Sequence, residues 1–239
     1  DRIVNRAADH GMLWVNAAGN YGKSHWQGAF TDTRGDGWHE FTPGNKLFPL
    51  EIGVDEIALV LLTWVDWPGS SLDYGVNLFW EGGGGNLTLM SYSDTAQQGK
   101  QPPVEAILAF TLPRGKYYLA IKKQEATEDA RFHLYSLIQD FPDAVSAGSL
   151  VSPATARGAF AVGATNGFDQ VQKYSSQGPT ADGRIKPDLV APDAVSTATY
   201  GRLGFPGTSA STPHVAGAAA LVLSAFPRMS VPQVREYLE

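Results

Sequence analysis

Apolar and polar positions recur with two different periods along the chain, and the change of period divides it into three regions. Near the start, residues 3–8 carry apolar side chains at helical spacing as far as Gly11. An apolar run over residues 12–18 follows and stops at Gly19-Asn20, which predicts a short buried strand. A helix, a turn and a buried strand in this order make one α/β unit.

The middle region, residues 24–145, has the period of strands. The predicted strands lie at residues 58–65, 74–80, 107–110, 117–121 and 132–138. The third and fourth are separated by a Leu-Pro-Arg-Gly turn signal, which predicts a hairpin. Several strands with turn signals and no convincing helix predict an antiparallel β-sandwich.

The α/β pattern returns in the last region. Short apolar runs at residues 160–164 and 189–191 predict two buried strands. Residues 209–225 are apolar at nearly every position, which predicts a helix buried on most of its sides. Ser230 and Pro232 mark the start of a last helix. We therefore predict an α/β domain formed by residues 1–23 and 146–239, and an inserted β-sandwich domain at residues 24–145.

The composition narrows the classes of function. The net charge is −6 and no block of Lys or Arg occurs, so nucleic acid is a poor candidate for the partner. Cysteine is absent, which excludes thiol catalysis, Cys-ligated zinc and disulfides. No uninterrupted apolar stretch reaches the roughly 18 residues of a membrane-spanning helix. The start at Asp1 is typical of the middle of a domain, so we expect the chain to be a piece of a longer protein.

Residues 207–217 carry the strongest chemical signal. Gly207 allows a close approach of the backbone, and Ser209 follows in the first turn of the predicted helix. Unpaired N–H groups and the positive end of the helix dipole lie at this place. A serine hydroxyl there can act as a nucleophile while its own N–H receives a developing oxyanion. The alternative for an isolated Gly-Thr-Ser is an ordinary serine N-cap.

Taken together, these residues resemble the nucleophile motif of the subtilisin-like serine proteases (subtilases), with small departures at its fourth and fifth positions. Residues 15–20 are similar to that family's Val-Xaa-Ala-Ala-Gly-Asn strand. Residues 174–180 and 184–192 are similar to its Ser-Ser-Xaa-Gly-Pro and Lys-Pro-Asp-Val-Val-Ala-Pro stretches. Asp193 then stands where the family has glycine, so the local turn is expected to differ.

The resemblance implies a fold, an activity and a set of site residues. The fold would be a partial subtilisin-like parallel-sheet domain interrupted by the inserted antiparallel β-sandwich. The intact enzyme would be a serine endopeptidase that acts on proteins or peptides, secreted by or on the surface of a bacterial cell. We expect no cofactor and assign no residue of this chain to a metal. The implied site residues are Ser209 and Asn20 for catalysis, Ala17, Ala18 and Gly19 for the primary specificity pocket, and Thr208 as a support.

The aspartate and histidine partners of the nucleophile are missing from this sequence. Neither a His-Gly-Thr-His-type segment nor an Asp-Ser-Gly or Asp-Thr-Gly segment occurs, and the family order puts both before the oxyanion asparagine. We expect them upstream of Asp1. His10 matches the helix before the predicted strand, and the resemblance makes His214 a structural residue. We therefore expect the fragment alone to be inactive and the intact parent to be a peptidase.

A hypothesis from another class stays open. The chain could belong to a non-catalytic binding or adhesion protein built on a degenerate protease scaffold. The two hypotheses differ in one feature, which is whether the parent sequence keeps the aspartate and histidine motifs.

Part of the middle region resembles bacterial pre-peptidase C-terminal-like sandwiches. The resemblance rests on residues 72–78, 105–107 and 113–118. Such a domain could bind substrate or another protein, or be a structural insertion without a ligand. Residues 32–37 are similar to a calcium loop, but Arg34 occupies an oxygen-ligand position, which favours an acidic turn.

Overall fold

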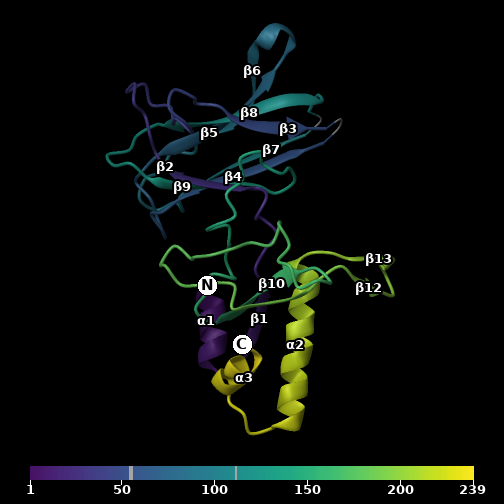
Figure 1. Cartoon of the computed structure of the whole chain (residues 1–239). Coiled ribbons are helices and arrows are strands. Elements are labelled where there is room, and N and C mark those ends of the chain that lie inside the picture. The colour runs from purple at the N-terminus through teal and green to yellow at the C-terminus, as the bar shows by residue number, and fades with distance from the viewer. Residues whose placement is uncertain (54–55, 111) are drawn as a thin grey trace. The chain divides into compact units, whose positions relative to one another are not determined.

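Two stretches far apart in the sequence pair in one parallel sheet of the computed structural model, which describes residues 1–53, 56–110 and 112–239. The sheet has the order β1-β10-β11, and Figure 1 labels the first two of these strands. Its strands are β1 (Trp14–Ala17), β10 (Ala159–Thr165) and β11 (Leu189–Pro192). All residues of the central strand β10 are buried, as expected for a parallel strand covered on both faces. The pairing of β1 with β10 places Ala17 beside Val162.

Three helices and a hairpin complete this α/β unit. The helices are α1 (Arg2–Asp9), α2 (Thr208–Ala225) and α3 (Val231–Leu238), and the hairpin joins β12 (Val195–Thr197) to β13 (Gly201–Phe205). Helix α2 packs on all three strands of the sheet and on α3, while α1 packs on β1 and β10. The hairpin follows β11 and leads the chain to the start of α2.

The predicted burial of α2 on most of its sides is wrong for this chain. Ala210, Val215 and Ala219 are buried against the sheet, whereas the side chain of Leu221 is 73% exposed and that of Leu223 is 38% exposed. A helix that is apolar all round does not reveal which of its sides are covered. Among the described residues, only the sheet and α3 make extensive contact with α2.

The inserted region forms two four-stranded antiparallel sheets, with the orders β2-β9-β4-β7 and β3-β8-β5-β6. The first contains β2 (His25–Ala29), β9 (Arg131–Ser136), β4 (Ala58–Trp64) and β7 (Val104–Ala109). The second contains β3 (Phe48–Ile52), β8 (Gly115–Lys123), β5 (Tyr74–Glu81) and β6 (Leu87–Ser93), with the short 3₁₀ helix η1 (Gly83–Gly85) between β5 and β6.

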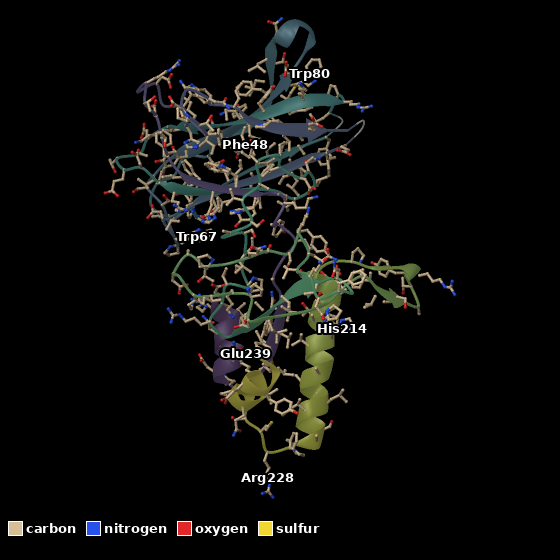
Figure 2. The ribbon with its side chains drawn as sticks, in the orientation of Figure 1. Phe48, Trp67, Trp80, His214, Arg228 and Glu239 are labelled. Carbon is tan, nitrogen blue, oxygen red and sulfur yellow. The ribbon has the colours of Figure 1, made fainter. Side chains whose placement is uncertain are left out.

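One apolar core fills the space between these two sheets. Alternate residues of β4 point into it, and the side chains of Val60, Leu62 and Trp64 are at most 1% exposed. Phe48 joins the same core from the other sheet (Figure 2). Phe132 joins it from β9. Two antiparallel sheets that share one core form a β-sandwich.

The predicted hairpin between residues 107–110 and 117–121 is wrong. Strand β7 pairs with β4, and β8 pairs with β3 and β5, so the two strands lie in different sheets. Tyr117 donates its hydroxyl hydrogen to Pro113 O (2.6 Å), and Leu112 is buried in the core. The chain therefore crosses from one sheet to the other, which lets both strands bury an apolar face.

The chain divides into two compact units. They are the α/β unit (Asp1–Lys23 with Ser146–Glu239) and the inserted unit (Ser24–Val145). The α/β architecture with a parallel sheet, interrupted by an antiparallel sandwich, confirms the predicted fold class. In the described part of the chain, no helix has both the length and the apolar character needed to span a membrane.

The two ends of the inserted unit are joined to each other. Val145 donates its N–H to His25 O (2.7 Å), and His25 Nδ1 bonds to Val145 O (2.6 Å). Within the α/β unit, Ser146 donates its hydroxyl hydrogen to Gly22 O (2.8 Å). Each unit therefore brings its own chain ends together at the point of insertion.

Candidate active site

The turn after β1 and the start of α2 are joined by hydrogen bonds around Thr208. The Thr208 hydroxyl accepts the N–H of Gly19 (3.2 Å) and donates to Asn20 Oδ1 (3.0 Å). Thr208 also donates its backbone N–H to Asn20 Oδ1 (3.0 Å). Ser176 donates its N–H to Gly19 O (2.9 Å) and so fixes the other side of the turn. Sequence positions almost 190 residues apart thus form one site.

Asn20 is oriented by these bonds. Its carbonyl oxygen is occupied by two donors of Thr208, so its amide Nδ2 is left to donate elsewhere, and among the described residues it has no hydrogen-bond acceptor. Gly207, at φ 108°, lies next to this amide: a Cβ at that position would come within 3.1 Å of Asn20 Nδ2. A glycine is therefore needed both for the backbone conformation and for the close approach.

Ser209 stands in the first turn of α2 with its side chain exposed. The N–H groups of Ala210 and Ser211 donate to Gly207 O (2.9 and 3.4 Å), and that of Thr208 donates to Asn20. In the part of the chain that the structure describes, the Ser209 N–H has no acceptor. It is thus an unpaired helix N-terminal donor, and the positive end of the helix dipole favours negative charge there.

Two unpaired donors, the Ser209 N–H and the Asn20 amide, therefore belong to residues that meet at the start of α2 beside an exposed serine hydroxyl. Donors of this kind stabilise the oxyanion that forms when a nucleophile attacks a carbonyl carbon. The chemistry that the arrangement can support is acyl transfer, provided that a base removes the serine proton.

The residues predicted to line a specificity pocket differ in exposure. Ala17 and Gly19 are half-buried, whereas Ala18 is fully buried and packs with Leu150 and Ala161. A contribution of Ala18 to substrate binding would therefore come from its backbone. The roles of these three residues in substrate binding stay predictions.

Neither histidine of the α/β unit bonds to Ser209. His214 projects from α2 (Figure 2), and its Nδ1 bonds to Ala210 O (2.8 Å). His10 lies at the end of α1, where its Nδ1 bonds to Arg6 O (2.7 Å). The described residues thus supply no base within hydrogen-bonding reach of Ser209.

Two residues that the sequence analysis did not assign to the site also contact it. The N–H of Gly207 donates to Tyr174 Oη (3.0 Å) and to Asp193 Oδ2 (3.2 Å). The one sequence signal for this contact is the departure from the family pattern at Asp193. Whether that carboxylate contacts Gly207 depends on the position of the start of α2 in three dimensions. The local sequence pattern does not specify that position.

In the acidic turn at residues 32–37, the carboxylate of Asp32 is hydrogen-bonded to backbone groups of the turn itself. Asp32 accepts the N–H groups of four residues, at 2.7–3.3 Å, namely Arg34, Gly35, Asp36 and Gly37. These bonds, above all the one from Gly37, hold the pKa of Asp32 below its usual value. Over residues 1–53, 56–110 and 112–239, no group of three or more His, Cys, Asp or Glu side chains is placed to hold a metal ion.

Sequence comparisons relate this chain to known proteins. The sequence profile of the subtilase family matches residues 90–239, a range that includes Ser209 and leaves out Asn20. Subtilisin amylosacchariticus from Bacillus subtilis subsp. amylosacchariticus is 40% identical over 94 residues, which are 39% of this chain and 24% of that protein. The chain thus spans about a quarter of the length of this subtilisin.

Two solved structures are similar to parts of the fold. The CspB protease of Clostridium perfringens has a TM-score of 0.64 at 19% identity, covering 98% of this chain and 55% of that one. At this identity the likeness shows the fold. The pre-peptidase C-terminal domain of collagenase from Bacillus anthracis has a TM-score of 0.33 at 15% identity, covering 52% of this chain and 96% of that domain. The identification of the inserted unit with such domains stays a prediction.

Proposed function

The chain belongs to the subtilase family, and we propose on this premise that its full-length protein is a serine endopeptidase with Ser209 as the nucleophile. The observation that carries the proposal is the meeting of two unpaired donors, the Ser209 N–H and the Asn20 amide, beside the exposed Ser209 hydroxyl. In this reaction, Ser209 Oγ attacks the peptide carbonyl, and the two donors receive the oxyanion.

The proton of Ser209 needs an acceptor that these residues do not provide. We propose that a histidine and an aspartate from parts of the full-length protein outside this chain supply the base and its orienting partner. The 239-residue chain by itself should therefore hydrolyse peptides no faster than the residual rate that substrate binding and oxyanion stabilisation alone can produce.

The substrate would be a protein or peptide that lies along the turn after β1. Ala17, Ala18 and Gly19 would form part of the primary pocket, where the small size of these residues leaves room for a large substrate residue. We propose a secreted or cell-surface location in a bacterium, in keeping with the bacterial subtilisins that the chain matches. For the inserted unit, binding of substrate or of another protein stays a prediction.

A serine-directed fluorophosphonate and a peptide-hydrolysis assay on the full-length protein test this proposal. We expect labelling and turnover in the wild type, and loss of both in Ser209→Ala. Ser224→Ala is a matched control, because Ser224 is an exposed serine near the far end of the same helix. An unlabelled, inactive wild type would favour a binding protein on a degenerate protease scaffold instead.

A further inference from the structure

Gly207 is the N-cap of α2, and the helix has no side-chain cap of its own. Its φ of 108° belongs to a region that glycine enters freely, so the residue alone does not fix the direction of its peptide groups. The peptide matters to the site because Gly207 O accepts the N–H groups of Ala210 and Ser211, the two residues that directly follow Ser209 in the first turn of α2. A contact that fixes the position of the Gly207 peptide therefore also fixes the start of α2.

The Gly207 N–H is held by the side chain of Asp193, whose exposed fraction is 6%. Asp193 Oδ2 accepts from Gly207 N (3.2 Å), and Oδ1 accepts from Gln172 Nε2 (2.9 Å). The backbone of Asp193 is also fixed, because its N–H donates to Thr165 O (2.9 Å). The carboxylate thus joins the end of β11, the segment after β10 and the start of α2.

We propose that Asp193 is a positioning residue for the nucleophile, which acts through Gly207 to set Ser209 against the Asn20 amide. This inference rests on the proposed function. Glycine, which the subtilase motif has at this position, carries no side chain to make the contact, so the bond is a feature of this chain.

Two physical arguments support this role of Asp193. One concerns the strength of its hydrogen bond to Gly207, and the other the precise geometry that the reaction needs. A hydrogen bond to a carboxylate is roughly twice as strong as one between neutral groups, and negative charge is favourable at a helix N-terminus. Tyr174 Oη shares the same N–H but is neutral. Because a displacement of about 1 Å at a reacting group can lower a rate by about a hundredfold, a modest loosening of Gly207 is enough to reduce turnover.

Asp193→Asn in the full-length protein is the discriminating variant. It keeps the shape of the side chain but removes its charge, so the Gly207 N–H loses its carboxylate acceptor and is left with a neutral one, and the bond to Gln172 has to rearrange. We expect kcat for a peptide substrate to fall about tenfold while KM changes less than about twofold, because the loss affects the reacting geometry and not the binding of substrate. Asp182→Asn is the control: its carboxylate lies on the surface of the same unit, beside Arg184, and both constants should keep their wild-type values.

A second measurement does not depend on activity. Hydrogen exchange of the Gly207 amide, read by mass spectrometry of peptic fragments of the full-length protein, should accelerate about tenfold in Asp193→Asn, whereas the Asp193 amide should stay protected by Thr165 O. An unchanged Gly207 exchange rate, or equal effects on kcat and KM, would overturn the role of Asp193. A wild-type protein that the fluorophosphonate does not label would overturn the proposed function, and the catalytic role of Asp193 with it.

Discussion

Thr208 shows how one side chain prepares another for a task. Its hydroxyl accepts from Gly19 and donates to Asn20, so the oxygen end of the Asn20 amide is occupied and the nitrogen end is left to donate. An amide has two ends that differ in function, and without these bonds either end could face a substrate. The Thr208 backbone N–H donates to the same oxygen and reinforces the choice.

Replacing the oxyanion donor should lower turnover without preventing folding. We expect Asn20→Ala in the full-length protein to lower kcat by a factor of about 10²–10³, the loss known for one such donor in subtilisin, with a small change in KM. Asn16→Ala is the matched control, because Asn16 lies on β1 and its side chain bonds to Trp14 and Ala17 of the same strand. Steady-state kinetics check the prediction, and equal kcat values in wild type and Asn20→Ala would refute the assignment.

Part of this site could be predicted from the sequence, because short motifs encode local geometry. The glycine and serine before an apolar helix specify a helix N-terminus, and the asparagine after a buried strand specifies a turn. The bonds from Asp193 and Tyr174 to Gly207 could not be predicted in the same way. They join loops whose paths depend on how the strands between them pack, and no periodicity records those paths.

At the scale of elements, the sheet and the last helix are tied by one carboxylate. Asp188, at the start of β11, accepts from Lys186 Nζ (2.6 Å), from the N–H of Ala161 on β10 (2.6 Å) and from Arg235 of α3 (3.0 Å). The Lys186 side chain is 4% exposed, and burial lowers its pKa below the usual value. Removal of the Asp188 carboxylate would leave the buried Lys186 ammonium group with the neutral acceptor Ala159 O (2.6 Å) but without its counter-charge.

Asp188→Asn should destabilise the α/β unit by on the order of 3 kcal/mol, because a buried charge that loses its partner keeps the cost of its desolvation. Urea unfolding, monitored by hydrogen exchange of the β10 amides, measures this loss of stability. Asp182→Asn removes a carboxylate from an exposed ion pair in the same unit and should leave the unfolding midpoint nearly unchanged. Similar midpoints for the two variants would contradict the prediction.

Of the described strands of the inserted unit, β4, β5, β7, β8 and β9 were predicted from the sequence, whereas β2, β3 and β6 were missed and the pairing of the strands could not be predicted. Alternation along β7 and β8 reveals which residues face a core, and this holds for either sheet of a sandwich. The choice of sheet depends on partners far away in the sequence, such as β4 for β7 and β5 for β8. Local turn signals at Pro113 and Gly115 therefore suggested a hairpin that the packing does not use.

At the scale of the whole molecule, the two units differ in their buried histidines. His25 and His39 of the inserted unit are at most 1% exposed, while both histidines of the α/β unit are exposed. His25 donates to Val145 O, so its Nε2 accepts from His133 Nδ1 (3.0 Å). His39 Nδ1 accepts the N–H of Thr31 (3.1 Å). Both rings are therefore neutral, and burial lowers the pKa of each to about 4.

These histidines should make the inserted unit sensitive to acid. Above pH 6.5 both states of each ring are neutral, and between pH 6.5 and about 4 only the unfolded state binds the proton, so stability falls as the pH falls. The loss is on the order of 3 kcal/mol for each histidine at the lower limit. Asp73 and Glu105, whose pKa values are raised by burial, act in the opposite direction over part of this range.

A variant of His39 separates the contribution of this histidine to the acid sensitivity from that of the buried carboxyl groups. His39→Gln keeps an acceptor for Thr31 but does not titrate, so the stability of the inserted unit should fall less steeply between pH 6.5 and 4.5, by about one proton. Five of the six tryptophans lie in this unit, so urea unfolding followed by tryptophan fluorescence reports mainly on it. Equal slopes for wild type and His39→Gln would show that the ring is already charged in the folded state.

The joined ends of the inserted unit have a consequence for how such a protein could arise. His25 and Val145 meet within hydrogen-bonding distance, and so do Gly22 and Ser146 in the unit that surrounds them. A gene segment that encodes residues 24–145 could therefore enter or leave an ancestral subtilase-family gene in one recombination event. The host would gain or lose a complete folded sandwich, and its own sheet would keep the same strand order and connections.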